Sequence, residues 1–547
     1  MQKFQANAIN KLKTLAIICG TTMVASGFLL AQKPIVKTEQ GVIIGATAKN
    51  PGVNAFLGIP YAAPPVGELR WKEPQPARGW NQPLLADKLP ASCMQVQVEG
   101  AGKGADGLPT PWTKEFRTQG NVSEDCLYLN IWVPARAKQN SLPVMVWFHG
   151  GGFREGSASI ATYIGDNLAA KGAVVVGINY RLGVFGFLAH PELSAESAHK
   201  ASGNYGTLDQ IAALQWIHKN IAAFGGDPAR VTLFGQSAGA GSVNILSVSP
   251  LASGLFHRAI AESGSYDTGD PTFSSGPMSY KKLEQAEQDG LAYAKLSGFT
   301  SVKDLRSLDA ERLLRLPMPK SAPREPFFRP TLDGWVLPMR YLDLYAAGKQ
   351  STINFITGSN ADENGASPQP NTTVAEFQSW AKNTFHDRAD EFLKLYPAHT
   401  DEEANLAQNQ AARDLRRTSL YLWALSYRKS SAQSLYVYYW NHVLPGESSA
   451  RFGAFHTSEV PYVFSSLSSM DRPYARKDME LADLLSSYWV NFAATGNPNG
   501  KGLPLWPEIQ PGKQEVFQIG DGTQAIPVAS PERFEFLKNV FESSRSW

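Results

Sequence analysis

The sequence predicts an α/β fold, in which a mostly parallel central sheet carries helices on both faces. The short apolar runs at 144–148 and 173–180 are typical of buried strands. Apolar residues at helical spacing follow over 208–221, and a further apolar run at 231–234 leads into a helix of small residues. Strands and helices that alternate in this way indicate parallel strands with helical crossovers.

The rest of the chain fits a single unit built on that sheet. Residues 353–357 predict another strand. The segment from about 270 to 350 is rich in helix formers and interrupted by prolines, which predicts a mostly helical insertion over the sheet. Because the sequence has no internal repeat and no low-complexity linker, we expect residues 32–547 to form one domain.

Charge and composition narrow the class of partner. Of 547 residues, 43% are hydrophobic and 18% are charged, as in ordinary globular enzymes. Lys and Arg together number 51 and Asp and Glu 49, and no run of five or more basic residues occurs. A polyanionic partner such as nucleic acid is therefore not indicated, and we expect a small-molecule substrate.

The amino-terminal residues predict export. Lys3, Lys11 and Lys13 form a positive region, and the apolar stretch 15–31 follows it. We expect residues 1–31 to be a signal peptide cleaved after Ala31, which makes the protein periplasmic or secreted. An uncleaved anchor is the alternative, but the stretch of about 17 residues is at the short limit for a membrane span.

Three cysteines bear on the redox environment. Cys19 lies in the predicted signal peptide, so the mature chain keeps Cys93 and Cys126. Two cysteines in an exported chain indicate one disulfide bond, and two buried free thiols are the alternative. The few cysteines and the absence of an H-E-x-x-H motif give no sign of a zinc site.

The motif at 235–239, Gly-Gln-Ser-Ala-Gly, predicts a catalytic serine. It is a G-x-S-x-G sequence that directly follows a predicted strand and precedes a helix. In an α/β-hydrolase fold, this strand–turn–helix lifts the hydroxyl of the central serine, here Ser237, above the sheet. The motif alone is weak, and an ordinary glycine turn is the alternative, but its strand and helix context favours catalysis.

A second glycine motif predicts an oxyanion hole. Residues 149–153, His-Gly-Gly-Gly-Phe, follow the predicted strand at 144–148, and three consecutive glycines leave backbone N–H groups free to converge on one oxygen. A phosphate loop would end in Lys-Ser or Lys-Thr, and none occurs here. We therefore assign Gly151, Gly152 and Ala238 as donors, and His149 as a structural residue.

The serine needs an acid and a base, and in this fold they follow it in the order Ser, acid, His. Asp362 and Glu363 come directly after the predicted strand at 353–357, where a carboxylate at the end of a sheet belongs, and either can serve as the acid.

Of the nine histidines, only those beyond the acid in the chain fit this order, and His456 and His442 are the two that we compare. His456 lies in a polar loop sequence and is favoured. His442 lies beside the aromatic run 438–440 and is more typical of a core or loop histidine.

These motifs resemble those of the type-B carboxylesterases, which include the cholinesterases and the bacterial p-nitrobenzyl-type esterases. The resemblance extends over about residues 33–540 and rests on long motifs in the family's order. They are GIPYAAPPVGELRW (58–71), EDCLYLNIW (124–132), HGGGF (149–153), NYRLGVFGFL (179–188), GNYGTLDQ (203–210), FGGDP (224–228), FGQSAGA (234–240), TLDG (331–334) and TGNPN (495–499).

The resemblance implies a carboxylic ester hydrolase without cofactor or metal, acting through an acyl-enzyme intermediate. The family's acid falls on Glu363, although Asn364 departs from the family pattern by delaying the glycine. The family's histidine stands three residues before a glutamate, which identifies His456. The family also pairs the cysteine of the EDC motif with one upstream, which implies a Cys93–Cys126 bond.

Two further hypotheses concern substrate and activity. Cholinesterases carry an acidic residue directly before the serine, whereas this chain has the neutral Gln236, so the resemblance implies a preference for neutral esters. Trp112 lies in the region of the cholinesterase cation-binding tryptophan, at a different spacing. An inactive binding module of the same fold and an amide or thioester hydrolase are the alternative functions.

Overall fold

The computed structural model describes residues 33–547 except 98–109, 139, 272–279, 297, 300, 316–327, 365–371, 447–448 and 545–547. The predicted signal peptide, residues 1–31, therefore lies outside the described residues. Within the described ranges, no helix is both long enough and apolar enough to span a bilayer.

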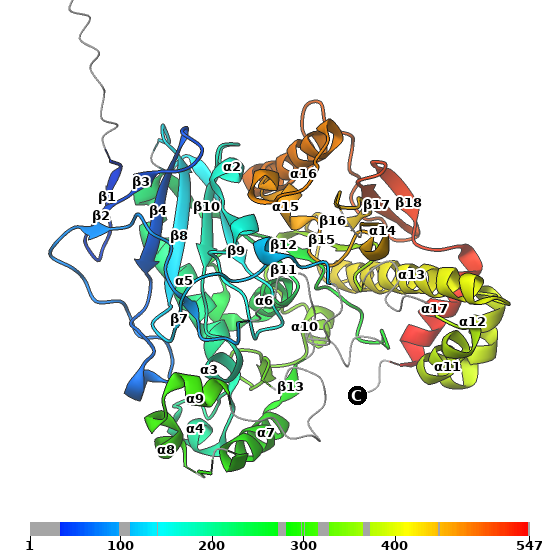
Figure 1. Cartoon of the computed structure of the whole chain (residues 1–547), viewed down its shortest axis with the longest axis horizontal. Helices are drawn as coiled ribbons and strands as arrows, with labels where there is room; N and C mark the ends of the chain where they lie inside the picture. The colour runs from blue at the N-terminus through cyan, green and yellow to red at the C-terminus, as the bar shows by residue number, and fades with distance from the viewer. Residues whose placement is uncertain are drawn as a thin grey trace, which may run out of the picture.

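The core of the molecule is a sheet of eleven strands (Figure 1). In spatial order they are β18 (Gln524–Pro527), β17 (Glu515–Ile519), β16 (Leu435–Trp440), β15 (Asn354–Asn360), β12 (Arg258–Glu262), β11 (Gly226–Gln236), β9 (Leu142–Phe148), β10 (Val174–Ile178), β8 (Tyr128–Pro134), β4 (Val53–Pro60) and β3 (Ala46–Thr47). Three smaller sheets lie outside it in the described residues: β1 (Ile35–Lys37) with β2 (Val42–Ile44) and β5 (Leu84–Leu85), β6 (Ser92–Cys93) with β7 (Val122–Ser123), and a short pair in the segment after β12 that is described below.

The seven strands from β17 to β10 run parallel, and antiparallel strands close both edges of the sheet. The parallel strands are buried on both faces, which explains why their sequences are continuous apolar runs rather than alternating apolar and polar residues. The strands predicted at 144–148, 173–180, 231–234 and 353–357 correspond to β9, β10, β11 and β15, so these predictions are confirmed.

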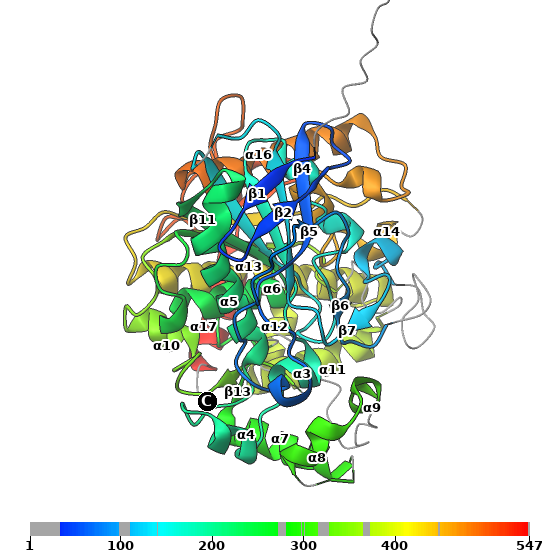
Figure 2. The same cartoon turned by 90° about the vertical axis from the view of Figure 1, so that its left-hand side faces the viewer.

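Helices cover both faces of the sheet, as predicted. In both views α16 lies on one side of the sheet, and α5, α6 and α13 lie on the other (Figures 1 and 2). The helices are α2 (Asp166–Ala169), α3 (Gly183–Phe187), α4 (Pro191–Glu196), α5 (Tyr205–Asn220), α6 (Ala238–Val248), α7 (Leu283–Leu296), α8 (Val302–Ser307), α9 (Ala310–Leu314), α10 (Tyr341–Ala346), α11 (Val374–Phe385), α12 (Ala389–Leu395), α13 (Asp401–Arg428), α14 (Ser449–Phe452), α15 (Val460–Val463), α16 (Arg476–Thr495) and α17 (Pro531–Ser543).

The segment predicted as a helical insertion carries α7, α8, α9 and α10 in its described residues, so its helical character is confirmed there. It also contains the short parallel pair β13 (Lys281–Lys282) and β14 (Thr331–Leu332). Figure 2 shows α7, α8 and α9 grouped beside α4 at one end of the molecule. Arg70 joins this group to the main body, because its guanidinium donates to the carbonyl oxygens of Arg306 and Leu308 and pairs with Glu124.

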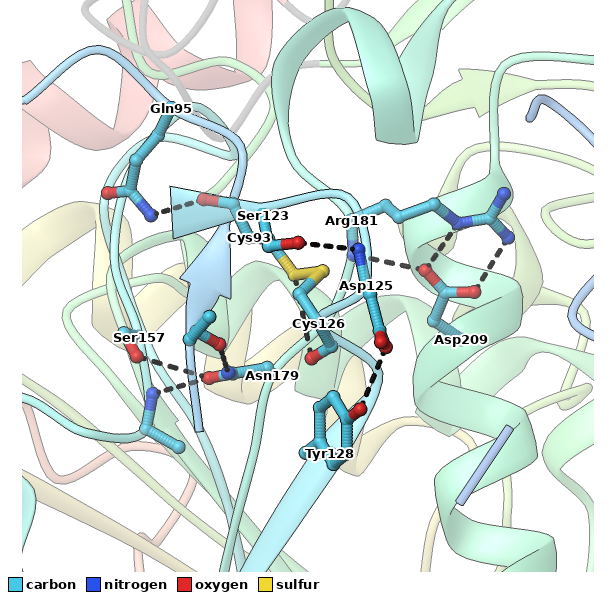
Figure 3. The surroundings of a disulfide bond; sticks show 12 residues. Cys93, Gln95, Ser123, Asp125, Cys126, Tyr128, Ser157, Asn179, Arg181 and Asp209 are labelled. Atoms are coloured by element: carbon cyan, nitrogen blue, oxygen red, sulfur yellow. Dashed lines mark hydrogen bonds and ion pairs between the residues drawn. A yellow bond between two sulfur atoms is a disulfide. The ribbon is translucent and has the colours of Figure 1, made fainter. Parts of the chain in front are cut away.

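Cys93 and Cys126 form a disulfide bond, with their Cα atoms 5.0 Å apart (Figure 3). The predicted bond is therefore present, and both cysteines are buried. Next to it, the guanidinium of Arg181 makes two hydrogen bonds to the carboxylate of Asp209, at 2.8 and 2.7 Å. The disulfide ties β6 to the residues that lead into β8, and the buried ion pair ties the residues after β10 to α5.

We predict that Cys93→Ala lowers the free energy of unfolding by about 3 kcal/mol, because it opens a loop of 33 residues in the unfolded chain. Chemical denaturation of the mature protein measures this loss. Cys126→Ala alone and the double variant should each show the same loss as Cys93→Ala. An additional loss in the double variant, or two thiols that label in the denatured, unreduced protein, would contradict the bond.

Candidate functional site

The candidate site lies at the carboxyl edge of the parallel strands. Four loops meet there, and they follow β9, β11, β15 and β16 in the chain. Because the four strands run parallel, with β9 beside β11 and β15 beside β16, their carboxyl ends open onto the same edge. Residues that lie far apart in the sequence are therefore brought together by the sheet alone.

Ser237 occupies the sharp turn between β11 and α6. Its backbone angles, φ 57° and ψ −123°, are unfavourable for a side chain and cost about 1–3 kcal/mol. Two glycines make the turn possible: a Cβ on Gly239 would lie 1.9 Å from the Phe148 carbonyl oxygen, and one on Gly235 would lie 2.7 Å from backbone atoms of Gly239. The Ser237 N–H donates to the Glu262 carbonyl, at 2.9 Å, which fixes the turn to the neighbouring strand β12.

The glycine loop after β9 lies directly against this turn. A Cβ on Gly150 would lie 3.1 Å from the Cβ of Ser237. Gly151 and Gly152 both have positive φ, at 109° and 62°, so the loop requires glycine at these positions. The carbonyl oxygen of Gly151 accepts from the N–H groups of Arg154 and Glu155, which closes the loop into a tight turn.

Three backbone N–H groups are free at this point. Within the described part of the chain, the N–H groups of Gly151 and Gly152 donate to no protein acceptor. Ala238 is the first residue of α6, where an N–H has no acceptor within its own helix. The positive end of the α6 dipole also lies here. Unpaired donors beside a serine hydroxyl are what an oxyanion requires.

Glu363 and His456 contact each other across two loops. The Nδ1 atom of His456 lies 2.5 Å from a carboxylate oxygen of Glu363, whose other oxygen accepts from the Asn360 N–H at 2.9 Å. The loops are held together by Asn360, whose side chain donates to the Phe455 carbonyl oxygen, and by the Asp362 N–H, which donates to the Ala454 carbonyl oxygen.

The competing candidates are engaged elsewhere. Asp362 accepts two hydrogen bonds from Arg413, at 2.8 and 2.6 Å, and one from the Ala454 N–H. His442 lies between Asp478 and Asp521, at 3.0 Å from each. Of the two acids and two bases that the sequence left open, the structure brings together Glu363 and His456.

The two partners shift each other's pKa. Burial lowers the pKa of His456, but the charge and hydrogen bond of Glu363 raise it by more, so it lies above its ordinary value. Burial raises the pKa of Glu363, and the interaction with His456 outweighs this effect, so the carboxyl is ionised at neutral pH. An ionised carboxylate on Nδ1 stabilises the histidine when its ring takes up a proton on Nε2.

His149 has a structural role, as predicted for it. Its ring stacks on Tyr180 with centroids 4.4 Å apart, and its Nδ1 lies 2.8 Å from the Gly150 carbonyl oxygen. Burial lowers the pKa of His149 to about 4, so the ring is neutral and supports the glycine loop.

Two buried glutamates behind the histidine were not assigned a role from the sequence. Glu459 accepts from the Asn360 side chain, and Glu262 accepts from the Trp489 indole at 2.7 Å. Burial raises the pKa of Glu459 to about 7 and that of Glu262 well above its usual range. The only sequence signal was the spacing of Glu459 from His456. Nothing in the sequence marks Glu262, because its burial depends on α16.

Gln236 and Trp112 both touch the histidine loop. The amide nitrogen of Gln236 lies 3.1 Å from the Nε2 of His456, and the Gln236 side chain is buried. The Trp112 indole donates to the His456 carbonyl oxygen at 3.2 Å and lies near the Thr457 hydroxyl. Trp112 thus ties down the loop that carries His456.

Among the described residues, no group of three or more His, Cys, Asp or Glu side chains is arranged to hold a metal ion. The chemistry within reach is that of a serine hydroxyl, a buried imidazole–carboxylate pair and unpaired N–H donors.

Comparison with known proteins identifies the family. The model of the Carboxylesterase family matches residues 32–537. The chain is 36% identical to a fumonisin B1 esterase of Sphingopyxis macrogoltabida, covering 90% of this chain and 88% of that protein. It is 34% identical to carboxylesterase 1E of Rattus norvegicus (90% and 91%) and 34% identical to a medium-chain fatty acyl-CoA hydrolase precursor of Anas platyrhynchos (98% and 98%).

The match covers almost the whole chain, and the sheet, the strained serine turn and the glycine loop agree with it. This chain belongs to the carboxylesterase family and is a serine ester hydrolase with the α/β-hydrolase fold.

Proposed function

We propose that Ser237, His456 and Glu363 form the catalytic triad and that Gly151, Gly152 and Ala238 form the oxyanion hole. The observation that carries this proposal is the 2.5 Å contact between His456 and Glu363 at the same sheet edge as the strained Ser237 turn. His456 removes the proton of Ser237, whose oxygen attacks the ester carbonyl.

The rest of the cycle follows from the same groups. The N–H donors stabilise the oxyanion of the tetrahedral intermediate, and His456 protonates the departing alcohol. Water then attacks the acyl-enzyme with His456 again as base, which releases the acid and restores Ser237. Glu363 keeps the imidazole in the required tautomer and stabilises its positive charge throughout.

The substrate preference that we propose is for neutral over cationic esters. Gln236 lies beside the Nε2 atom of His456, and it carries no charge that would attract a cationic alcohol. The Trp112 indole is only partly exposed and its N–H is engaged with the histidine loop, which argues against a free cation-binding face. Short to medium acyl chains are the starting expectation.

We further propose that residues 1–31 are a cleaved export signal and that residues 32–547 act as one catalytic domain. The Cys93–Cys126 bond supports export, because structural disulfides form and persist in oxidising compartments.

We predict that Ser237→Ala and His456→Ala each lower kcat/KM for a para-nitrophenyl ester by about 10⁴-fold or more, because each removes a group that acts only in concert with the others. Steady-state kinetics with circular dichroism as a folding check measures this. His442→Ala is the matched control and should keep activity within about tenfold of the parent. Inactivity of the His442 variant alone, or an active Ser237 variant, would overturn the assignment.

We predict that the acid limb of the kcat/KM profile lies above the ordinary histidine pKa of about 6.5, because Glu363 favours protonated His456, which cannot act as a base. Glu363→Gln removes this charge, so the limb should move to lower pH while the plateau falls. An unmoved limb in the Gln variant would exclude Glu363 as the partner of the base.

We predict that Gln236→Glu raises kcat/KM for butyrylthiocholine relative to a neutral thioester of the same acyl chain by about tenfold, because it places a carboxylate beside the reaction centre. The same variant should move the acid limb to higher pH, since a second carboxylate stabilises protonated His456. A parent enzyme that already favours the choline thioester would contradict the proposed preference.

A further inference from the structure

Helix α13 carries three arginines close together, and they differ in their partners. Arg413 pairs with Asp362, and Arg417 pairs with Asp414 at 2.6 Å. Arg416 makes no hydrogen bond or ion pair to any residue that the structure describes. A guanidinium carries five N–H donors, so an arginine without an acceptor at a partly buried position is unusual.

The Arg416 guanidinium instead lies over the ring of Tyr266, with its carbon 4.3 Å from the ring centroid. The Tyr266 hydroxyl donates to the Ser263 carbonyl oxygen at 3.1 Å. Ser263 is the residue after Glu262, whose carbonyl accepts from the Ser237 N–H. The aromatic ring therefore connects the free cation to the strand that holds the nucleophile turn.

The position of α13 brings the same cation close to the acid and the base. Arg413, one turn earlier on the helix, is bonded to Asp362, the neighbour of Glu363 in the chain. Nearly two turns further along the same helix, the Ser419 hydroxyl accepts from the Asp267 N–H at 3.0 Å. The helix segment 413–419 thus lies along both the Glu363 loop and the Tyr266 loop.

The surroundings of Arg416 keep it charged. Burial lowers the pKa of Arg416, but Tyr266, Asp270 and Glu363 raise it by more. Glu363 is already bonded to His456 and Asn360, and within the described part of the chain neither Asp270 nor Glu363 forms an ion pair with the guanidinium. The side chain is partly exposed, so a ligand can reach it.

We propose that Arg416, braced by Tyr266, is an anion subsite beside the catalytic centre, and that it selects esters bearing a free carboxylate. A guanidinium matches the planar carboxylate with two parallel hydrogen bonds. Arg416 is a single cation with the carboxylates of Asp270 and Glu363 nearby. It therefore suits a ligand with one negative charge better than a doubly charged phosphate, which would leave surplus negative charge in a partly buried place. This inference rests on the proposed triad and adds a specificity residue to it.

The test compares two substrates with the same acyl chain and leaving group: the para-nitrophenyl monoester of adipic acid and its methyl ester, in which the distal carboxylate is capped. The ratio that is measured is kcat/KM for the anionic ester divided by kcat/KM for the capped ester. Arg416→Met should lower this ratio by about tenfold or more, mainly by raising KM for the anionic ester. Arg416→Lys should restore part of the ratio. A second pair, para-carboxyphenyl hexanoate and its methyl ester, places the carboxylate on the alcohol side.

Arg476→Met is the matched control, because it removes one positive charge from a side chain that is 92% exposed, at the start of α16. It should leave both ratios unchanged. A lowered ratio in either substrate pair for the Arg416 variant alone supports the subsite and says which side of the ester it reads.

Two outcomes would overturn the subsite while leaving the proposed triad intact. One is that Arg416→Met leaves kcat/KM unchanged for all four esters. The other is an equal loss for the anionic and capped esters of each pair, which leaves both ratios unchanged and would make Arg416 a residue that positions Glu363 rather than one that binds substrate. The proposed triad is tested separately, by the loss of hydrolysis in the Ser237 variant. Failure of the triad and failure of the subsite are therefore distinguishable.

Discussion

The backbone of Ser237 is held in an unfavourable conformation by the close approach of three segments. The Phe148 carbonyl at the end of β9 leaves no room for a side chain on Gly239, and the Ser237 N–H is tied to β12. The energetic cost of the turn, about 1–3 kcal/mol, is offset by the burial of the sheet around it. Because the glycine loop packs on the same turn, the position of the N–H donors depends on it as well.

Charge is the second constraint on the site. The imidazole of His456 lies among the carboxyl groups of Glu363 and Glu459, with Arg416 as a counter-charge further out. Glu363 is held ionised by its contact with the histidine, whereas burial raises the pKa of Glu459 to about 7. Neighbouring acids with different pKa values allow one group to stabilise a transient positive charge while the other stays partly protonated.

The outer parts of the molecule keep these groups in place without touching substrate. The disulfide ties β6 to the residues that lead into β8, and the Arg181–Asp209 pair ties the residues after β10 to α5. Asp414 on α13 accepts from Arg417 of the same helix and from the Tyr396 hydroxyl, which ties the helix of Arg416 to the residues after α12. These buried pairs make the spacing of the active-site loops rigid, so substrate selection depends on the residues that face the reaction centre.

The residues that depend on local backbone geometry could be predicted from the sequence alone. A serine turn between strand and helix requires glycine at fixed positions, and a donor loop requires consecutive glycines, so Ser237, Gly151 and Gly152 are visible as motifs. The parallel strands are visible for the same kind of reason, because burial on both faces leaves a continuous apolar run.

Partners that meet only through folding were decided by the tertiary structure. From the residues alone, Asp362 and Glu363 were equivalent, and only the packing of α13, which supplies Arg413, directs one to an arginine and the other to the histidine. Arg416 gives no signal in the sequence, since a cation on a polar helix is ordinarily a solvated surface residue. Its place above Tyr266 arises from a contact between segments about 150 residues apart, which no local pattern encodes.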